Sequence, residues 1–211
     1  MRGGASCPPN RAPTVLADFL KHGSNAALAL AIAAASAAAL SGFAPLVIWA
    51  VGLGALCFFA SEYTTHRFLF HAPPSKMPFV LRLQHRLHYD HHREPARLDL
   101  LFLPLWFVVP ATAAFAAVYA LGTRDATLTF SLVVGSLCGL LYYEWVHFVA
   151  HVPFKPLTAY GRWIKKYHLW HHFKSERHWF GVTNPLVDVA GRTYIRVEDA
   201  AQSPSVRILH P

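Results

Sequence analysis

Long apolar stretches alternate with polar, histidine-containing segments along this chain. Residues 25–61 carry no charge, and Ser41, Gly42 and Pro45 interrupt them near the middle. One helix over that stretch would be about 55 Å long, whereas the hydrocarbon core of a bilayer is about 30 Å thick. The pattern therefore predicts a helical hairpin, with one arm over residues 26–40 and the other over residues 45–60.

A second hairpin is predicted further along the chain. Residues 100–121 are uncharged, and Pro104 and Pro110 can kink a membrane helix there without excluding it. The Gly-Thr-Arg-Asp sequence at 122–125 is typical of a turn, and residues 126–143 form a fourth apolar stretch that ends at Glu144. We therefore expect an all-α integral membrane protein with four transmembrane helices in two hairpins.

Two other interpretations of these stretches are weaker. The Ala-rich residues 26–40 resemble the core of a signal peptide, but a long polar segment precedes them and a second apolar stretch follows at once. Any single stretch could also be a buried helix of a soluble protein. Four such stretches in one chain are typical of a membrane protein.

Composition supports the membrane interpretation, and charge gives it an orientation. The 211 residues are 54% hydrophobic and only 14% charged, with a net charge of +8, which disfavours a disordered chain, a coiled coil or a nucleic-acid-binding tail. Of the 19 Lys and Arg residues, only Arg124 lies in a turn within a predicted hairpin. The positive-inside rule then predicts that both termini and the segment between the hairpins are cytoplasmic.

Histidine is the other unusual feature, with 14 residues against 11 Asp and Glu. Ten histidines form four short motifs on the predicted cytoplasmic side, namely His66 and His71; His88, His91 and His92; His147 and His151; and His168, His171 and His172. Helical residues three or four apart share a face, so each of the last three motifs should converge. His66 and His71 are five apart, and a helix end or a π-bulge could aim both at one site.

These motifs indicate a metal centre. Neutral imidazole binds iron, zinc, copper and nickel, and ten imidazoles would supply about five ligands to each of two ions. The sequence contains no HExxH, no glycine-rich phosphate loop and no GxSxG motif, so the chemistry has to come from the metals. Four further histidines lie outside the motifs and are not expected to be ligands, namely His22, His85, His178 and His210.

The motifs resemble those of the fatty acid hydroxylase branch of the membrane fatty acid hydroxylase/sterol desaturase superfamily. The similar segments are EYTTHRFLFH at 62–71, HYDHH at 88–92, HFVAH at 147–151, KKYHLWHHF at 165–173 and FGVTNPLVD at 180–188. The resemblance covers about residues 60–190 and fades after Asp188. It implies a cytoplasmic helical cap over four membrane helices, holding a dimetal centre whose ligand positions fall on the ten motif histidines.

The resemblance also implies an activity. Members of this family use O2 and two electrons to hydroxylate a lipid C–H bond, with iron as the catalytic metal, although zinc suits the same ligands. The family members that this sequence resembles most act at C2 of a fatty acyl chain or of a ceramide-type lipid. Alternatives are a sterol- or carotenoid-type hydroxylase or desaturase with the same metal core, and a non-enzymatic membrane metal-binding protein. The last is disfavoured because the predicted spans hold almost no polar residues.

We expect three parts in the chain. These are a cytoplasmic N-terminal segment at residues 1–24, a membrane-embedded hydroxylase domain at residues 25–190, and a polar, mobile tail at residues 191–211. The N-terminal segment is too short for a fused cytochrome b5 domain, so a separate ferredoxin, cytochrome or reductase should supply electrons. A basic face could dock that donor or contact anionic lipid, and consists of Lys155, Arg162, Lys165, Lys166, Lys174 and Arg177.

Acidic and aromatic residues near the motifs complete the expected site. Three carboxylates are expected to orient imidazoles: Glu62 lies four residues before His66, Glu144 three before His147, and Asp188 matches an acidic position of the family motif. Asp90, inside a histidine motif, is a further candidate. Five aromatic residues could line an apolar groove for the lipid or take part in ordinary packing, namely Phe68, Phe70, Trp145, Phe148 and Trp179.

Overall fold

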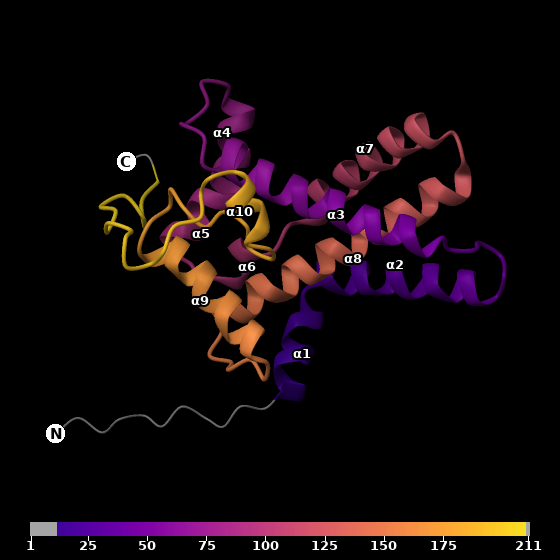
Figure 1. Ribbon diagram of the computed structural model, residues 1–211, viewed down its shortest axis with the longest axis horizontal. Helices are drawn as coiled ribbons and strands as arrows, with labels where there is room; N and C mark the ends of the chain where they lie inside the picture. The colour runs from indigo at the N-terminus through magenta and orange to yellow at the C-terminus, as the bar shows by residue number, and fades with distance from the viewer. Residues whose placement is uncertain (1–11, 210–211) are drawn as a thin grey trace.

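The computed structural model describes residues 12–209, and within that range the chain is helical and contains no strand (Figure 1). The α-helices are α1 (Ala12–Lys21), α2 (Gly23–Leu40), α3 (Ile48–Thr65), α4 (Pro78–Gln84), α5 (Asp90–Arg93), α6 (Leu98–Leu101), α7 (Leu105–Thr123), α8 (Ala126–His151), α9 (Ala159–Phe173) and α10 (Leu186–Ala190). Two π-helical turns, η1 (His66–Phe70) and η2 (His85–Tyr89), follow α3 and α4. Cys7 and His210 lie outside the described residues.

Three helical segments are long and apolar enough to cross a membrane, namely Gly23–Leu40, Leu98–Thr123 and Ala126–His151. The arm predicted at residues 45–60 forms α3, which has 18 residues but ends in a polar turn that contains Glu62. The structure thus supports three of the four predicted spans, and the fourth stays a prediction. Large apolar side chains such as Leu30, Val118 and Leu121 are exposed on these helices, as expected for surfaces that face lipid.

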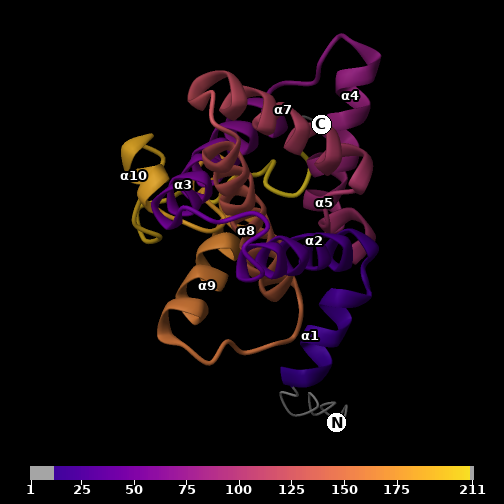
Figure 2. The same ribbon diagram turned by 90° about the vertical axis from the view of Figure 1, so that its right-hand side faces the viewer.

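Helix α8 lies at the centre of the helical bundle, with α2, α3 and α7 around it (Figure 2). Its closest partner is α3, and two glycines make that approach possible. A Cβ atom on Gly54 would lie 2.0 Å from the Leu132 carbonyl oxygen, and one on Gly135 would lie 2.0 Å from the Val51 carbonyl oxygen. The Ser136 hydroxyl also donates to the Gly54 carbonyl across this contact. The two helices therefore pack backbone against backbone, as small residues allow in membranes.

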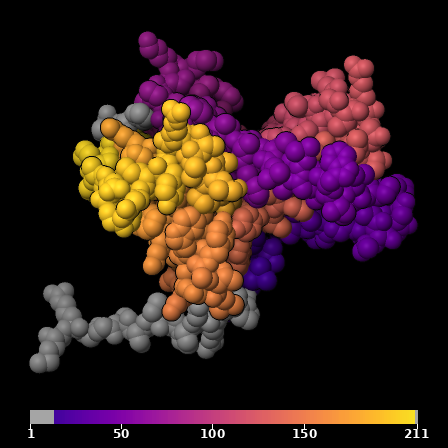
Figure 3. Space-filling view, viewed as in Figure 1, coloured from indigo at the N-terminus to yellow at the C-terminus, as the bar shows by residue number. Residues whose placement is uncertain are grey.

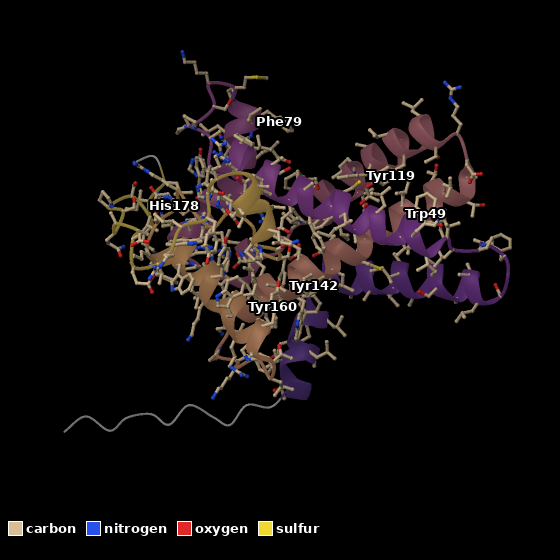
Figure 4. The ribbon with its side chains drawn as sticks, viewed as in Figure 1. Trp49, Phe79, Tyr119, Tyr142, Tyr160 and His178 are labelled. Carbon is tan, nitrogen blue, oxygen red and sulfur yellow. The ribbon has the colours of Figure 1, made fainter. Side chains whose placement is uncertain are left out.

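The two predicted turns lie at one end of the bundle and the histidine motifs at the other. Asp125 accepts a hydrogen bond from the Leu128 amide and begins α8 at the turn after α7. At the opposite end, η1, η2, α5, α9 and α10 gather into a cap, seen on the left of Figure 1. Figure 4 marks these two ends by Trp49, near the start of α3, and His178 in the cap. The topology therefore brings motifs that are far apart in sequence to one level.

The C-terminal segment covers one face of the cap (Figure 3). The Ser203 amide donates to the Lys174 carbonyl at 2.8 Å, and Val206 and Leu209 are buried. No path was predicted for this segment, and its mobility stays a prediction. Its packing brings residues 203–209 beside the histidine motifs.

Candidate metal centre

The ten motif histidines form two groups of five, and within each group the ligand atoms lie within 4.8 Å of one another. The first group consists of His66, His71, His88, His92 and His171, and the second of His91, His147, His151, His168 and His172. Five imidazoles for each of two ions is the distribution that the sequence predicted.

The three-histidine motifs do not each converge on one point, contrary to our expectation. His91 belongs to the second group and its neighbour His92 to the first, and the same division separates His172 from His171. Successive helical residues point about 100° apart, so two adjacent histidines on one helix face different sites. Each of these motifs therefore joins the two groups.

A π-helical turn resolves the spacing of His66 and His71. The His71 amide donates to the His66 carbonyl five residues earlier, at 3.0 Å, which brings both side chains into the first group. A second turn of this kind, η2, precedes Asp90 and was not anticipated. His88 lies within this turn, two residues before α5, and His92 of α5 joins the same group.

Imidazole nitrogens face one another at hydrogen-bonding distance in both groups. In the first, Nε2 of His88 lies 3.2 Å from Nε2 of His66 and 2.7 Å from Nε2 of His71, and Nε2 of His171 lies 2.9 Å from that of His71. In the second, the Nε2 atoms of His147 and His91 are 3.0 Å apart. One neutral imidazole has a single N–H, so shared protons cannot satisfy so many converging nitrogens.

Burial keeps these imidazoles in the form that binds metal. Desolvation lowers the pKa of His66, His88 and His171 well below the ordinary value for histidine, and neighbouring imidazoles lower it further. The same causes lower the pKa of His91, His92, His168 and His172. These side chains are therefore neutral near pH 7, and a neutral imidazole is a ligand. Nε2 of His92 and of His172 is buried without a partner, so both groups fit a metal ion.

Backbone carbonyls orient three imidazoles of the first group. Nδ1 of His66 donates to the Phe180 carbonyl at 2.5 Å, Nδ1 of His171 to the His178 carbonyl at 2.8 Å, and Nδ1 of His92 to the Val206 carbonyl at 3.0 Å. Each bond fixes the proton on Nδ1 and leaves Nε2 free to coordinate. In the second group, Nδ1 of His91, His147, His168 and His172 has no such partner among the described residues.

The loop between α9 and α10 supplies two of those carbonyls through an uncommon backbone conformation. Trp179 has φ of +61°, which a bulky residue rarely adopts. Its amide donates to the Thr193 carbonyl and its indole Nε1 to the Ile195 carbonyl, and its side chain is fully buried. The residues on either side, His178 and Phe180, can then turn their carbonyls towards His171 and His66.

The acidic residues Asp188 and Glu62 were predicted to orient imidazoles, but they form hydrogen bonds with this loop instead. Asp188 accepts hydrogen bonds from the amides of Phe180 and Gly181, from Tyr167 and from Thr193. Glu62 accepts from the Val182 and Thr183 amides and from the Thr183 hydroxyl. The Gly181 amide that Asp188 binds belongs to the same peptide group as the Phe180 carbonyl, so Asp188 acts on His66 through one intervening peptide group. The orienting carbonyls of Phe180, His178 and Val206 were missed because nothing in a side-chain pattern reveals them.

The other two acidic candidates have different partners. Glu144 is buried and accepts from the Leu103 amide at 3.0 Å, which ties α8 to the segment before α7, and its second oxygen has no partner. Asp90 pairs with His85 at 3.0 Å, so His85 lies outside both groups, as expected. His22 bonds Ser24, and His178 bonds Ser175 through its side chain.

An apolar cavity between α3, α7 and α8 reaches the first histidine group. His66, Phe70 and Thr65 line its cap end, and Phe58, Leu140 and Phe115 line it within the bundle. We call it the acyl cavity, after the substrate that the resemblance of the motifs implies. Of the five predicted groove aromatics, Phe70 lines it. Trp145 and Phe148 pack with Phe19 and Phe102, and Trp179 packs in the core of the cap.

Residues 51–193 match the family model named fatty acid hydroxylase, which covers more than half of the chain. The chain belongs to the fatty acid hydroxylase family. This identification agrees with the resemblance of the histidine motifs, and the paired groups above are consistent with a histidine-ligated metal cofactor in this family member.

Named relatives and one solved structure agree with the family. The chain is 32% identical over 149 residues to fatty acid 2-hydroxylase of Rattus norvegicus, covering 69% of this chain and 39% of the relative. It is 31% identical over 153 residues to dihydroceramide fatty acyl 2-hydroxylase FAH2 of Arabidopsis thaliana, covering 72% and 63%. The structure titled "Full length scs7p (only hydroxylase domain visible)" matches with a TM-score of 0.70 and 28% identity, over 84% of this chain and 67% of that one. The chain thus spans well under half of the rat relative's length.

Proposed function

We propose that this protein is an O2-dependent membrane lipid hydroxylase that acts at C2 of a fatty acyl chain. The observation that carries the proposal is an apolar cavity among membrane helices that ends at a group of five neutral imidazoles. Relatives named for 2-hydroxylation of fatty acids and of dihydroceramide support the acyl chain as substrate. They also make a sterol- or carotenoid-type reaction, or metal binding without catalysis, the less favoured alternatives.

The ten histidines would hold two iron ions. Reduced iron bound there would activate O2, and O2 would supply the oxidising power that replaces an unactivated C–H bond by C–OH. One oxygen atom enters the lipid, and the other leaves as water with two electrons from a donor and two protons. Neutral imidazoles with orienting carbonyls keep their Nε2 atoms available for the metals without any change in protonation.

The chain's own residues bind the substrate and exclude water. Phe58, Leu140 and Phe115 offer an apolar wall to the acyl tail. Phe70 lines the same cavity and stacks on His88, with ring centres 5.4 Å apart, which keeps water from that side of the first group. The tail would therefore reach the metals from within the bilayer.

We further propose that α3 is the fourth span, that the cap is cytoplasmic, and that a separate protein donates electrons. Arg124 is the single basic residue in the two turns at the end of the bundle opposite the histidines, which supports this orientation. Three residues of the basic face are engaged within the chain: Lys165 donates to three carbonyls, and Arg162 and Lys174 also donate to carbonyls. Lys166 is exposed and is better placed to contact a donor.

Metal analysis and lipid analysis of one variant pair test the function. His171→Ala should lower the metal content from about two ions per chain and abolish 2-hydroxy acyl lipids in cells that express it. His85→Ala is the matched control, because His85 lies outside both groups, and it should retain both. Purified protein with one zinc per chain, together with unchanged lipids in His171→Ala, would contradict the proposal. Oxygen gained by another lipid class would contradict the acyl substrate alone.

A further inference from the structure

A second cavity reaches the first histidine group from the cap. It lies between η1, the residues after α9 and the C-terminal segment, and we call it the cap cavity. Its wall consists of Arg67, Phe68, His71, Glu176, Arg177, Phe180, Ser205 and Leu209, and the one acidic residue among them, Glu176, is buried. Phe68 is 64% exposed at its edge, so the cavity opens to the surface.

The first histidine group lies between the two cavities. His66 and Phe70 line the acyl cavity, whereas His71 and Phe180 line the cap cavity. The Phe180 ring centre lies 5.1 Å from that of His71 and 5.7 Å from that of His66. The histidines that line these two cavities both belong to the first group. A ligand that filled both cavities would therefore pass this group and not the second.

The cap cavity combines apolar walls with positive charge. Arg67 donates through one nitrogen to the Tyr63 hydroxyl and the Gly191 carbonyl, and its guanidinium lies 4.9 Å from the Phe68 ring centre. The Arg177 side chain is 77% exposed, and its distance of 3.8 Å from Glu176 is long for an ion pair. Glu176 instead accepts hydrogen bonds from Ser203 and Ser205. The exposed charge of the cavity is thus cationic.

We propose that the cap cavity binds the polar head of the acyl substrate, and that its guanidinium groups select a head with a carboxylate or a phosphate. This inference rests on the proposed hydroxylase function. The tail would lie among the membrane helices and the head in the cap, as a lipid lies in a bilayer. The carbons nearest the head would then lie beside the first histidine group, which gives a physical reason for oxidation at C2.

Binding without turnover tests the head site. The full-length, metal-loaded protein in neutral detergent is titrated without O2 with a long-chain fatty acid, a lysophosphatidic acid and an uncharged ceramide. Arg177→Gln should weaken binding of the anionic lipids by roughly tenfold, the usual effect of losing one charge-assisted hydrogen bond, and should leave the ceramide unchanged. Arg177→Lys should restore most of the affinity. Arg82→Gln is the matched control, because Arg82 is an exposed arginine of α4 that does not line the cavity.

The two anionic probes distinguish a carboxylate head from a phosphate head, because the head that fits the cavity better should bind more tightly to the wild type and lose more affinity in Arg177→Gln. Equal affinities in wild type, Arg177→Gln and Arg82→Gln would overturn the proposal, as would an equal loss for the ceramide. A product assay in air separates this result from the function. Hydroxylated lipid with unchanged affinities refutes the head site alone. Altered affinities with no product from wild type support the head site and refute the hydroxylase.

Discussion

The oriented imidazole of His66 depends on a peptide group that another side chain holds in place. His66 is oriented by the Phe180 carbonyl, the Phe180 amide is bound by Asp188, and Asp188 also binds Tyr167 and Thr193. The carboxylate is fully buried and accepts four hydrogen bonds. At this scale the decisive group for the metal site is one acid that touches no imidazole.

Asp188→Asn should therefore weaken metal binding although it removes no ligand. An amide in place of the carboxylate turns an NH2 group towards backbone N–H donors, and each unsatisfied buried donor costs about 1–3 kcal/mol. We expect a lower unfolding temperature and a loss of about one metal ion per chain, measured by elemental analysis. Asp90→Asn, which changes a partly exposed acid paired with His85, should retain both ions. Full metal content in Asp188→Asn would show that the loop does not orient the first group.

Helices α3 and α8 form the rigid element of the molecule. Gly54 and Gly135 let the two backbones touch, and α8 then continues to His147 and His151 while α3 continues into η1. Any change in their separation would displace ligands of both groups at once.

A methyl group on Gly54 should reveal this constraint. Its Cβ would meet the Leu132 carbonyl, so the helices must separate, which costs about 1–3 kcal/mol. Thermal unfolding should show Gly54→Ala to be less stable and poorer in metal. Gly52→Ala is the matched control on the same helix, since its Cβ meets no atom within 4 Å, and it should be neutral or slightly stabilising. Equal behaviour of the two variants would contradict close backbone packing.

Helix α7 has one face in the acyl cavity and another that is exposed. Thr112 lines the cavity, whereas Val109 is 61% exposed. Thr112→Trp should fill the cavity and shift the products towards shorter acyl chains, or lower turnover of long ones at least severalfold. Val109→Trp should leave the chain-length profile unchanged. Mass spectrometry of the hydroxylated lipids measures both, and a profile unaffected by Thr112→Trp would place the tail elsewhere.

The sequence predicted the helical class, the apolar segments and the ten histidines, because hydropathy and side-chain identity are local properties. It wrongly predicted that His91 and His92 converge on one site. The spacing of residues shows which side chains share a helix face, but it does not show that two neighbouring side chains point to different sites. The sequence missed the carbonyls of His178, Phe180 and Val206, because every residue has a carbonyl and only the fold selects these three. It also gave α7 no role in the cavity.

For the whole molecule, the proposed orientation places the histidine end and the Arg124 turn on opposite sides of the membrane. In a variant without its native cysteines, Arg124→Cys should react with a membrane-impermeant thiol reagent in intact cells. Lys166→Cys, an exposed position of α9, should react only after the cells are opened. The reverse result would invert the orientation. Labelling of both positions in intact cells would contradict a spanning bundle.

The division of neighbouring histidines between the two groups has a consequence for metal loading. His91 with His92, and His171 with His172, are covalently adjacent yet belong to different groups, so each pair would supply ligands to both ions. Binding of one ion orders the backbone segments that also carry ligands of the other ion. The second ion therefore binds at a lower cost in conformational entropy, because its ligands are already ordered. Metal should therefore be acquired in pairs, and native mass spectra of partly loaded protein should show empty and doubly loaded chains with few intermediates. The centre would then behave as one cooperative unit.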